Sequence, residues 1–289
     1  MATEGPRQRK QQPQEKMDGT PKGGVLGHLG PQHVEEHGTA MQILRSLVIL
    51  SWFMATCMCI VVTQLIGSPL YFVDRSYFKA YMAMTKRFFG IAITALTEWA
   101  CPTPVRVSGD KTVQGQIGLL KDGQLDGGFP HRLVLIANHQ VYTDWLYLWW
   151  VSYTNRLHGH IYIILKESLK YIPFLGQGMM FYGFIFMARK WLADKPRLQH
   201  RLQKLNTAIS PATTDPPVYE PMWLLIFPEG TNLSPRTKKS SDAYAEKQGK
   251  AKFDHMLLPR STGLFFCLQQ LKGTVDWVYD CTIGYDGHP

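Results

Sequence analysis

The sequence predicts an α/β fold in which a mixed sheet is flanked by helices, with the functional site at strand ends and an N-terminal transmembrane helix in front. From about Pro102 onward, short apolar runs alternate with helical or loop stretches. Polar residues stand directly where several of these runs end, which is where ligands bind in such folds. Ahead of them, residues 46–66 contain no charged side chain. Together these observations predict an α/β domain that is anchored to a membrane.

The overall composition favours a protein that meets a membrane and an anionic partner. Of the 289 residues, 45% are hydrophobic and only 18% are charged, below the roughly one quarter that is usual for soluble domains. The formal net charge is +9, which favours phosphate-bearing partners such as lipid headgroups or nucleotides. The sequence carries no nucleic-acid-binding signature, so no nucleic-acid partner is expected. The five cysteines form no zinc or disulfide pattern, and no metal site is predicted.

Three segments follow one another along the chain. Residues 1–40 are rich in Gly, Pro, Gln and Lys, which is typical of a disordered tail. Residues 41–101 are expected to form transmembrane and membrane-associated helices, because the 21 residues of 46–66 would extend about 31 Å as a helix and cross the hydrocarbon core. The apolar run 88–97 is too short to span alone and is expected to lie against the membrane or the first helix. Residues 102–289 form the α/β domain.

Five short apolar runs within this domain have the length of buried strands. Between the third and the fourth, leucines recur at near-helical spacing over 192–205 and predict a helix. Residues 110–128 and 211–221 are rich in turn formers and are interpreted as loops. The uncharged stretch 171–188 is interrupted by Pro and Gly, which favours a loop and short helix followed by a strand over a second span. The predicted strands are 133–137, 161–165, 184–187, 223–227 and 278–283.

His139 and Asp144 stand just beyond the first predicted strand and form the candidate catalytic pair. On one continuous helix they would point about 140° apart, so they can meet only where the backbone bends, as it does between a strand and a helix. Histidine suits general-base work near neutral pH, and a buried carboxylate on its second ring nitrogen would select the tautomer. No neighbouring Ser or Cys forms a convincing nucleophile. The pair therefore predicts activation of a substrate hydroxyl.

Two further strand ends carry candidate substrate-binding residues. Arg189 follows the strand at 184–187, where a guanidinium can bind a phosphate through two hydrogen bonds or, as an interface residue, reach toward lipid headgroups. Glu229, Gly230 and Thr231 follow the next strand, where the glycine lets a ligand approach the backbone, although Pro-Glu-Gly also makes an ordinary turn. A basic cluster comes next, which suits headgroup or coenzyme phosphates or a solvated loop: Arg236, Lys238, Lys239, Lys247, Lys250, Lys252 and Arg260.

Four stretches in this order resemble the membrane-bound glycerophospholipid acyltransferase family, to which the 1-acylglycerol-3-phosphate acyltransferases belong. They are Asn138-His139 with Asp144, Gly183 to Arg189, Phe227 to Thr231, and Val278 to Ile283, and the resemblance covers about residues 130–285. Finer features resemble the lysocardiolipin, lysophosphatidylinositol and related lysophosphatidate acyltransferases, among them Lys166-Glu167 and Leu258-Pro259-Arg260. Such proteins usually continue with further apolar segments, so the acyltransferase domain is expected to be truncated at its C-terminal end.

The resemblance implies an acyl-CoA-dependent acyltransferase of phospholipid synthesis or remodelling that esterifies a free glycerol hydroxyl of a lysophospholipid. His139 would take the hydroxyl proton, and Asp144 would orient His139. The residues implied to place the acceptor phosphate are Arg189, Glu229, Gly230 and Thr231. Acyl-CoA would be a co-substrate, and no bound cofactor or metal is implied. The expected location is a membrane, in the first place that of the endoplasmic reticulum.

Two other functions remain open on the sequence. A CoA-independent transacylase, which moves acyl chains between phospholipids, would use the same His139–Asp144 pair. An inactive scaffold that binds membrane lipid would keep the fold without the reaction, although the intact pair and Glu229-Gly230 argue against it. Transfer in the absence of acyl-CoA distinguishes the first from the acyl-CoA-dependent enzyme, and the absence of any transfer identifies the second.

Overall fold

The computed structural model describes residues 38–100, 102–121, 123–209 and 215–285. Most of the predicted tail, residues 1–37, lies outside this part of the chain, as do residues 211–214 of the second predicted loop. The described chain begins with three helices, α1 (Thr39–Gly67), α2 (Leu70–Val73) and α3 (Arg75–Ala100). A short 3-10 helix and a pair of three-residue strands follow: η1 (Lys111–Val113), β1 (Ile117–Leu119) and β2 (Leu125–Gly127).

Strands and helices then alternate to the end of the described chain. The strands are β3 (Arg132–Ala137), β4 (Ile161–Lys166), β5 (Ile185–Met187), β6 (Met222–Ile226) and β7 (Val278–Cys281). The helices are α4 (Asp144–Thr154), η2 (Glu167–Tyr171), α5 (Leu175–Phe181), α6 (Trp191–Leu205), α7 (Pro235–Lys247) and α8 (Ser261–Leu271). All five predicted strands are present, and the stretch 171–188 forms a loop, a short helix and a strand, as expected.

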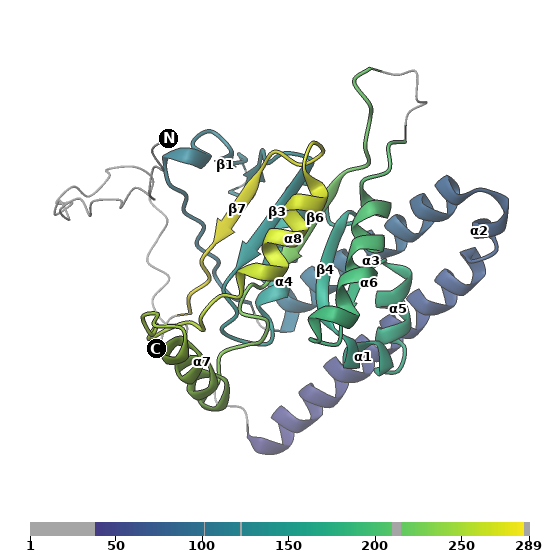
Figure 1. Ribbon diagram of the computed structural model, residues 1–289. Coiled ribbons are helices and arrows are strands. Elements are labelled where there is room, and N and C mark those ends of the chain that lie inside the picture. Colours follow the sequence, from purple (N-terminus) through teal and green to yellow (C-terminus); the bar gives the residue numbers. More distant parts are fainter. Residues whose placement is uncertain (1–37, 101, 122, 210–214, 286–289) are drawn as a thin grey trace. The chain divides into compact units, whose positions relative to one another are not determined.

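The five strands form one sheet in the order β5-β4-β6-β3-β7, in which every neighbouring pair is parallel. The α/β class is confirmed, but this sheet is parallel where the sequence predicted a mixed one. The reason is that helices connect successive strands. A helical crossover returns the chain to the end of the sheet where the previous strand began, so the next strand runs parallel to it. Figure 1 shows the arrows of β3 and β7 pointing the same way, so residues that follow these strands gather at one edge.

A β-hairpin replaces part of the loop that the sequence predicts at 110–128. β1 and β2 pair antiparallel, with Gly118 opposite Asp126, and they stay outside the five-stranded sheet. The interpretation of this segment as a loop was therefore wrong. Strands of three residues are too short to show an apolar periodicity, and the Gly and Asp residues of the segment are typical of turns.

Alternate residues of β6 belong to two different hydrophobic clusters. Trp223 and Leu225 pack with α4 and α3 on one face of the sheet, whereas Leu224 and Ile226 pack with α6 and α8 on the other. Figure 1 shows α6 and α8 lying over the second face. All five residues of β6 are buried. A parallel sheet covered on both faces explains why its strands are continuous apolar runs in the sequence.

α1 and α3 run antiparallel along each other. The Tyr81 hydroxyl donates to the Thr63 carbonyl at 3.0 Å near one end of the pair, and the Arg45 guanidinium donates to the Ala100 carbonyl near the other. Phe89 of α3 packs against Trp149 of α4, with ring centroids 5.3 Å apart. The apolar run 88–97 is thus the second half of a longer helix, which lies between α1 and the sheet domain.

Within the described residues, the helical stretch Thr39–Val73 is long and apolar enough to cross a membrane, judged by length and composition alone. Only 11% of its most apolar window is buried against the rest of the protein. A buried core helix would hide most of this surface, so the exposed side chains of α1 require an apolar environment of another kind. This supports association with a membrane.

We expect α1 to hold the protein in membranes against extraction with alkaline carbonate. Lysine at Leu50 and Met58, both exposed on α1, should release the chain, because each charge near the centre of a span costs about 3 kcal/mol. The matched control places lysine at Leu119 and Leu120, which are exposed outside α1, and should stay bound. Extraction of the unaltered chain by carbonate would contradict the predicted span.

Lys86 is a buried cation beneath the sheet. Its Nζ donates to the Ile161 carbonyl at 2.9 Å and lies 3.8 Å from the centre of the Tyr162 ring. Burial lowers the pKa of Lys86 from an ordinary 10.5 to about 7, and the charge of Glu220 opposes this only in part. The folded state therefore binds fewer protons than the unfolded state above pH 7, so stability rises with pH from about 7 to 10.5.

This dependence can be measured between pH 7 and 9. Below this window, His158 and His160 titrate with pKa values lowered to about 4 by burial. Above it, the thiols of Cys267 and Cys281, whose pKa values burial raises, reverse the trend. We expect the free energy of unfolding to rise by at most about 1.4 kcal/mol per pH unit. Melting temperatures of the detergent-solubilised Lys86→Met variant should lose this rise, whereas Lys79→Met, on the same helix and exposed, should keep it. Equal slopes in all three proteins would contradict the assignment.

Candidate active site

The predicted pair meets at the carboxyl edge of the sheet. His139 follows β3, the backbone turns, and Asp144 begins α4. The distance between His139 Nδ1 and Asp144 Oδ2 is 2.8 Å. The Asp144 side chain is fully buried, whereas 18% of the His139 side chain is exposed. The bend that the five-residue spacing requires is therefore present, and part of the imidazole is accessible from outside the protein.

The Asp144 carboxylate accepts hydrogen bonds from three groups. Besides His139, the Val141 amide donates to Oδ2 at 3.1 Å and the Tyr285 hydroxyl donates to Oδ1 at 2.6 Å. Because a carboxylate only accepts, His139 must present Nδ1–H to it, and this leaves the lone pair on Nε2. Among the described residues, Nε2 makes no hydrogen bond. The arrangement can thus accept a proton at Nε2 from a group outside the protein.

Glu229, one of the predicted phosphate-placing residues, contacts the backbone on both sides of this site. Its Oε1 accepts the His139 amide at 3.1 Å, and its Oε2 accepts the Leu257 amide at 3.2 Å. Burial raises the pKa of Glu229, while the two amides and the neighbouring His139 oppose that shift. Glu229 thereby ties the turn after β3 to the segment that precedes α8.

The loop after β6 encloses His139. The Phe227 ring stacks on the imidazole, with centroids 4.2 Å apart, and the Leu233 amide donates to the His139 carbonyl at 2.7 Å. Between them, Gly230 has a φ of +74°, and a Cβ there would meet nothing within 4 Å. A turn with a positive φ explains the glycine, and the empty space beside it is compatible with a ligand. No hydrogen bond of Thr231 to the other predicted residues is present in the described part of the chain.

Cys281 ends β7 directly beside Ala137 of β3, which places a thiol near the site. Burial, assisted by the charge of Asp280, raises the pKa of Cys281 to about 11. The thiol is therefore protonated at neutral pH, and a protonated thiol is a poor nucleophile. Cys281 therefore offers no activated nucleophile to His139.

Arg189 is held in an unusual backbone conformation after β5. Its φ is +65°, which costs a residue with a Cβ about 1–2 kcal/mol. The buried Asp194 carboxylate accepts the amides on both sides of it, from Ala188 at 2.8 Å and from Lys190 at 2.9 Å. Asp194 lies in the first turn of α6, where a negative charge is favourable. The strained turn is thus stabilised by one carboxylate and presents an exposed guanidinium.

Arg189 and Arg260 lie close enough for the charge of one to influence the other. Partial burial and, secondarily, the charge of Arg260 lower the pKa of Arg189. The Arg260 amide donates to the Pro228 carbonyl at 2.8 Å, which connects it to the loop of Glu229. In the basic cluster, Lys238 pairs with Asp242 on α7, so this lysine is neutralised within the protein. No ion pair of Arg189 or Arg260 occurs among the described residues.

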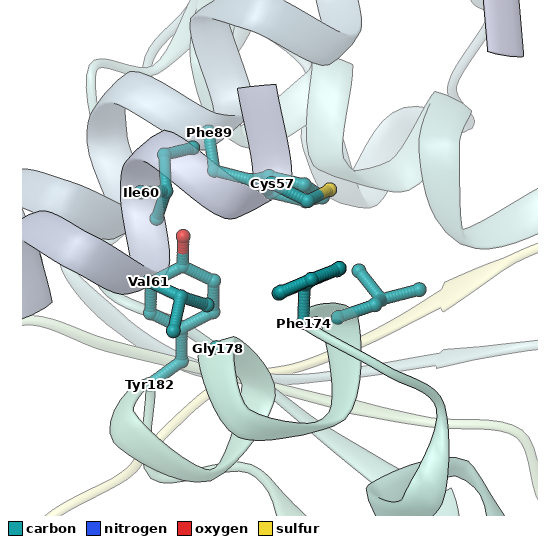
Figure 2. A pocket seen from close by; sticks show the side chains of 8 residues that line it. Cys57, Ile60, Val61, Phe89, Phe174, Gly178 and Tyr182 are labelled. Atoms are coloured by element: carbon teal, nitrogen blue, oxygen red, sulfur yellow. The ribbon is translucent and has the colours of Figure 1, made fainter. Parts of the chain in front are cut away.

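An apolar pocket lies away from this polar edge. Figure 2 shows it between α1, α3 and the segment around α5. Its labelled side chains are those of Cys57, Ile60, Val61, Phe89, Phe174, Gly178 and Tyr182. Its volume of about 10 Å³ admits at most one water molecule. We regard it as a gap in the packing of α1, not as a substrate site.

Sequence reasoning missed several residues that shape the site. Tyr285 contacts Asp144 directly, yet it did not stand out by type or spacing. Phe227 and Asp194 also contact predicted residues, and they were noted only as parts of motifs that resemble the family. Asn138 was noted only as part of a motif, although its side chain makes two hydrogen bonds to the Ile283 backbone. The only local signal was position, because these residues lie just beyond strands whose carboxyl ends share one edge.

The fold and site define an α/β protein with a carboxylate-supported imidazole at one sheet edge and unpaired arginines nearby. A family model described as Acyltransferase matches residues 105–285. An uncharacterised acyltransferase of Schizosaccharomyces pombe is 40% identical over 220 residues, which cover 76% of this chain and 60% of that protein. The 2-acyl-1-lysophosphatidylinositol acyltransferase of Saccharomyces cerevisiae is 35% identical over 277 residues, 87% of this chain and 70% of that protein.

The chain belongs to the Acyltransferase family. The lysocardiolipin acyltransferase 1 of Gallus gallus is 34% identical over 227 residues, 75% of this chain. The chain spans about half, 51%, of that relative's length. No solved structure matches significantly. Relatives that match this chain are named as lysophosphatidylinositol, lysocardiolipin and 1-acyl-sn-glycerol-3-phosphate acyltransferases.

Proposed function

We propose that the chain transfers an acyl group from acyl-CoA to a free glycerol hydroxyl of a lysophospholipid of the lysophosphatidate, lysophosphatidylinositol or lysocardiolipin class. The observation that carries this proposal is the His139–Asp144 pair, in which Nδ1 is bound at 2.8 Å and Nε2 has no hydrogen bond among the described residues. A base of this kind, without an activated nucleophile beside it, suits direct transfer to a hydroxyl. The names of the relatives support the lipid acceptor.

In the proposed reaction, His139 Nε2 takes the proton of the acceptor hydroxyl while its oxygen attacks the thioester carbonyl carbon. The C–S bond then breaks, and the coenzyme leaves as a thiolate that takes the proton back from the imidazolium. Asp144 keeps Nδ1 protonated throughout and stabilises the cation that forms on the ring. His139 and Asp144 are thus the proposed general base and its positioning carboxylate, and no covalent intermediate with the protein is formed.

The acceptor phosphate would lie against Arg189. This guanidinium is exposed and unpaired in the described structure, and Asp194 holds its backbone in place. Gly230 and Thr231 would border the same ligand, where the open space beside Gly230 supports a close approach. Glu229 would instead hold the turn that carries His139, as its two hydrogen bonds to backbone amides support. An ionised carboxylate would repel a phosphate, so we assign the charge pairing to Arg189 alone.

Membranes that contain the expressed full chain, compared with membranes that lack it, provide the test. Labelled acyl-CoA is offered with lysophosphatidate, lysophosphatidylinositol or monolysocardiolipin, and acylated product is measured. Product that depends on acyl-CoA supports the proposal. Product formed equally from a donor phospholipid without CoA would establish a transacylase instead, and no product with any acceptor would indicate a lipid-binding scaffold. We propose the endoplasmic reticulum as the membrane of residence, which fractionation of tagged protein tests.

Replacing Arg189 by Lys should raise the KM for the lysophospholipid about tenfold and leave the KM for acyl-CoA unchanged. Lysine keeps the charge but cannot make the two parallel hydrogen bonds of a guanidinium to phosphate oxygens. Arg189→Ala should be worse, because a desolvated phosphate would be left unpaired. Arg197→Lys, an exposed arginine on α6 that pairs with Glu167, is the matched control and should change neither constant. Unchanged constants for Arg189→Lys would make Arg189 an interface residue.

A further inference from the structure

We infer that Tyr285 is a positioning residue for the proposed reaction, the third member of a Tyr285–Asp144–His139 hydrogen-bond chain. The inference rests on the proposed function, because it assigns a task to the base of that reaction. Tyr285 follows the last strand and lies 141 positions from Asp144 in the sequence. Its hydroxyl donates to Asp144 Oδ1 at 2.6 Å, while His139 binds Oδ2. The two oxygens of one buried carboxylate are thus held from opposite ends.

The distance and burial mark this as a strong interaction. O–H···O⁻ bonds of about 2.5–2.7 Å are characteristic of an ionised acceptor. Burial, and then the hydrogen bond and negative charge of Asp144, raise the pKa of Tyr285 far above its ordinary value. The phenol therefore stays protonated and donates throughout the working pH range. Tyr285 cannot itself serve as a base, so its contribution must pass through Asp144.

The position of Tyr285 beside Asp144 is fixed by contacts between the end of the chain segment after β7 and the end of β3. β7 pairs with β3 up to Cys281. Beyond it, the Asn138 side chain both donates a hydrogen bond to the backbone of Ile283 and accepts one from it. Its Nδ2 donates to the Ile283 carbonyl at 2.9 Å, and its Oδ1 accepts the Ile283 amide at 2.7 Å. Asn138 immediately precedes His139, so one residue joins the base and the tyrosine segment. The Tyr147 ring of α4 packs edge-on against Tyr285 at 5.9 Å.

The Tyr285 hydroxyl influences both the orientation of the Asp144 carboxylate and the negative charge that this carboxylate presents to His139. With Tyr285 on Oδ1 and the Val141 amide and His139 on Oδ2, the carboxylate has no freedom to rotate. The Tyr285 hydroxyl also draws negative charge toward Oδ1. Without this hydroxyl, the full negative charge of Asp144 would act on the imidazole of His139. The imidazole would then hold a proton more tightly, and a higher pH would be needed before it could act as a base. The other titratable group that faces the pair is Glu229, after β6, whereas Tyr147 of α4 faces the Tyr285 ring.

Tyr285→Phe tests this because it removes only the hydroxyl and keeps the ring. Tyr147→Phe is the matched control, since its ring contacts Tyr285 while its hydroxyl makes no hydrogen bond in the described part of the chain. We expect kcat of Tyr285→Phe to fall about tenfold, with both KM values unchanged. The acidic limb of its pH–rate profile should move up by about half a pH unit or more. The control should match the unaltered protein in both respects.

The shape of the pH profile, scaled to its own maximum, does not depend on how much protein is folded, so a lower yield leaves the test valid. An unmoved acidic limb, or a change confined to KM, would overturn the inference. A second readout needs no activity: carbethoxylation of His139 by diethyl pyrocarbonate, followed by peptide mass spectrometry, reports the neutral ring against pH. If the unaltered chain transfers no acyl group, the proposed function fails. The dependence of His139 carbethoxylation on pH would still decide whether Tyr285 influences His139.

Discussion

His139→Ala is expected to lower kcat for acyl transfer by about 10²–10⁴-fold, because the acceptor hydroxyl then loses its base. The structure makes this a clean substitution. The two hydrogen bonds that anchor residue 139 to Glu229 and Leu233 are made by its backbone and survive the change. Asp144 keeps its bonds to Val141 and Tyr285, so the buried charge is not left alone. The variant should therefore fold and remain bound to membranes.

The measurement is initial rate against acyl-CoA and lysophospholipid in membranes with equal amounts of the two proteins. His200→Ala is the matched control, since His200 is an exposed histidine on α6. We expect this control to retain full activity. A His139→Ala protein with near-normal kcat would show that the imidazole is not the base, and the proposed mechanism would have to be abandoned.

Asp144→Asn should reduce kcat by about 10³–10⁴-fold, an effect close to that of losing the imidazole itself. The cause is the hydrogen-bond pattern around residue 144. Three donors converge on this side chain, from His139, Val141 and Tyr285. An amide offers one accepting oxygen and directs N–H groups from its other end. In either orientation of the introduced amide, its N–H groups face one of the three donors. If that donor is His139, the imidazole must turn an unprotonated Nδ1 toward the amide, and Nε2 then carries the proton and has no lone pair for the substrate.

The test is the same rate assay, supplemented by the melting temperature in detergent. Asp242→Asn on α7 is the matched control: it removes a charge paired with Lys238 at 2.7 Å, half-exposed and outside the site. We expect the control to change the rate by less than about twofold, since exposed pairs contribute little. If Asp144→Asn kept more than a tenth of the activity at an unchanged melting temperature, control of the tautomer by Asp144 would be disproved.

Much of the sheet could be predicted because its central strands, β3 and β6, are largely buried on both faces. The runs at 133–137 and 223–227 lie within one residue of β3 and β6, since a continuous apolar run ends where the backbone leaves the core. The hairpin β1–β2 escaped prediction because three-residue strands with an exposed side have no such signal. The order of strands is also absent from local sequence. β6, the fourth strand of this sheet along the chain, enters between β3 and β4.

The sequence by itself determined which side chains could do chemistry here. His139 and Asp144 stand at a strand–helix boundary, and Arg189 and Glu229 follow other apolar runs, so their types and positions indicated a base and a charged edge. These predictions can be made from the sequence because they depend on the few residues around each strand end. The distance of 2.8 Å between the members of the pair follows from one local bend of the backbone.

Only the tertiary structure decided what those side chains contact. Glu229 reaches His139 across 90 positions of sequence, and Tyr285 reaches Asp144 across 141. Such contacts depend on the parallel pairing of β3 with β6 and β7, which brings three distant strand ends to one edge. A hydrogen bond acts over about 3 Å, so its partner is known only once the strand order is known. For this reason the pair was visible in the sequence, whereas the contacts by which Glu229 and Tyr285 hold it were not.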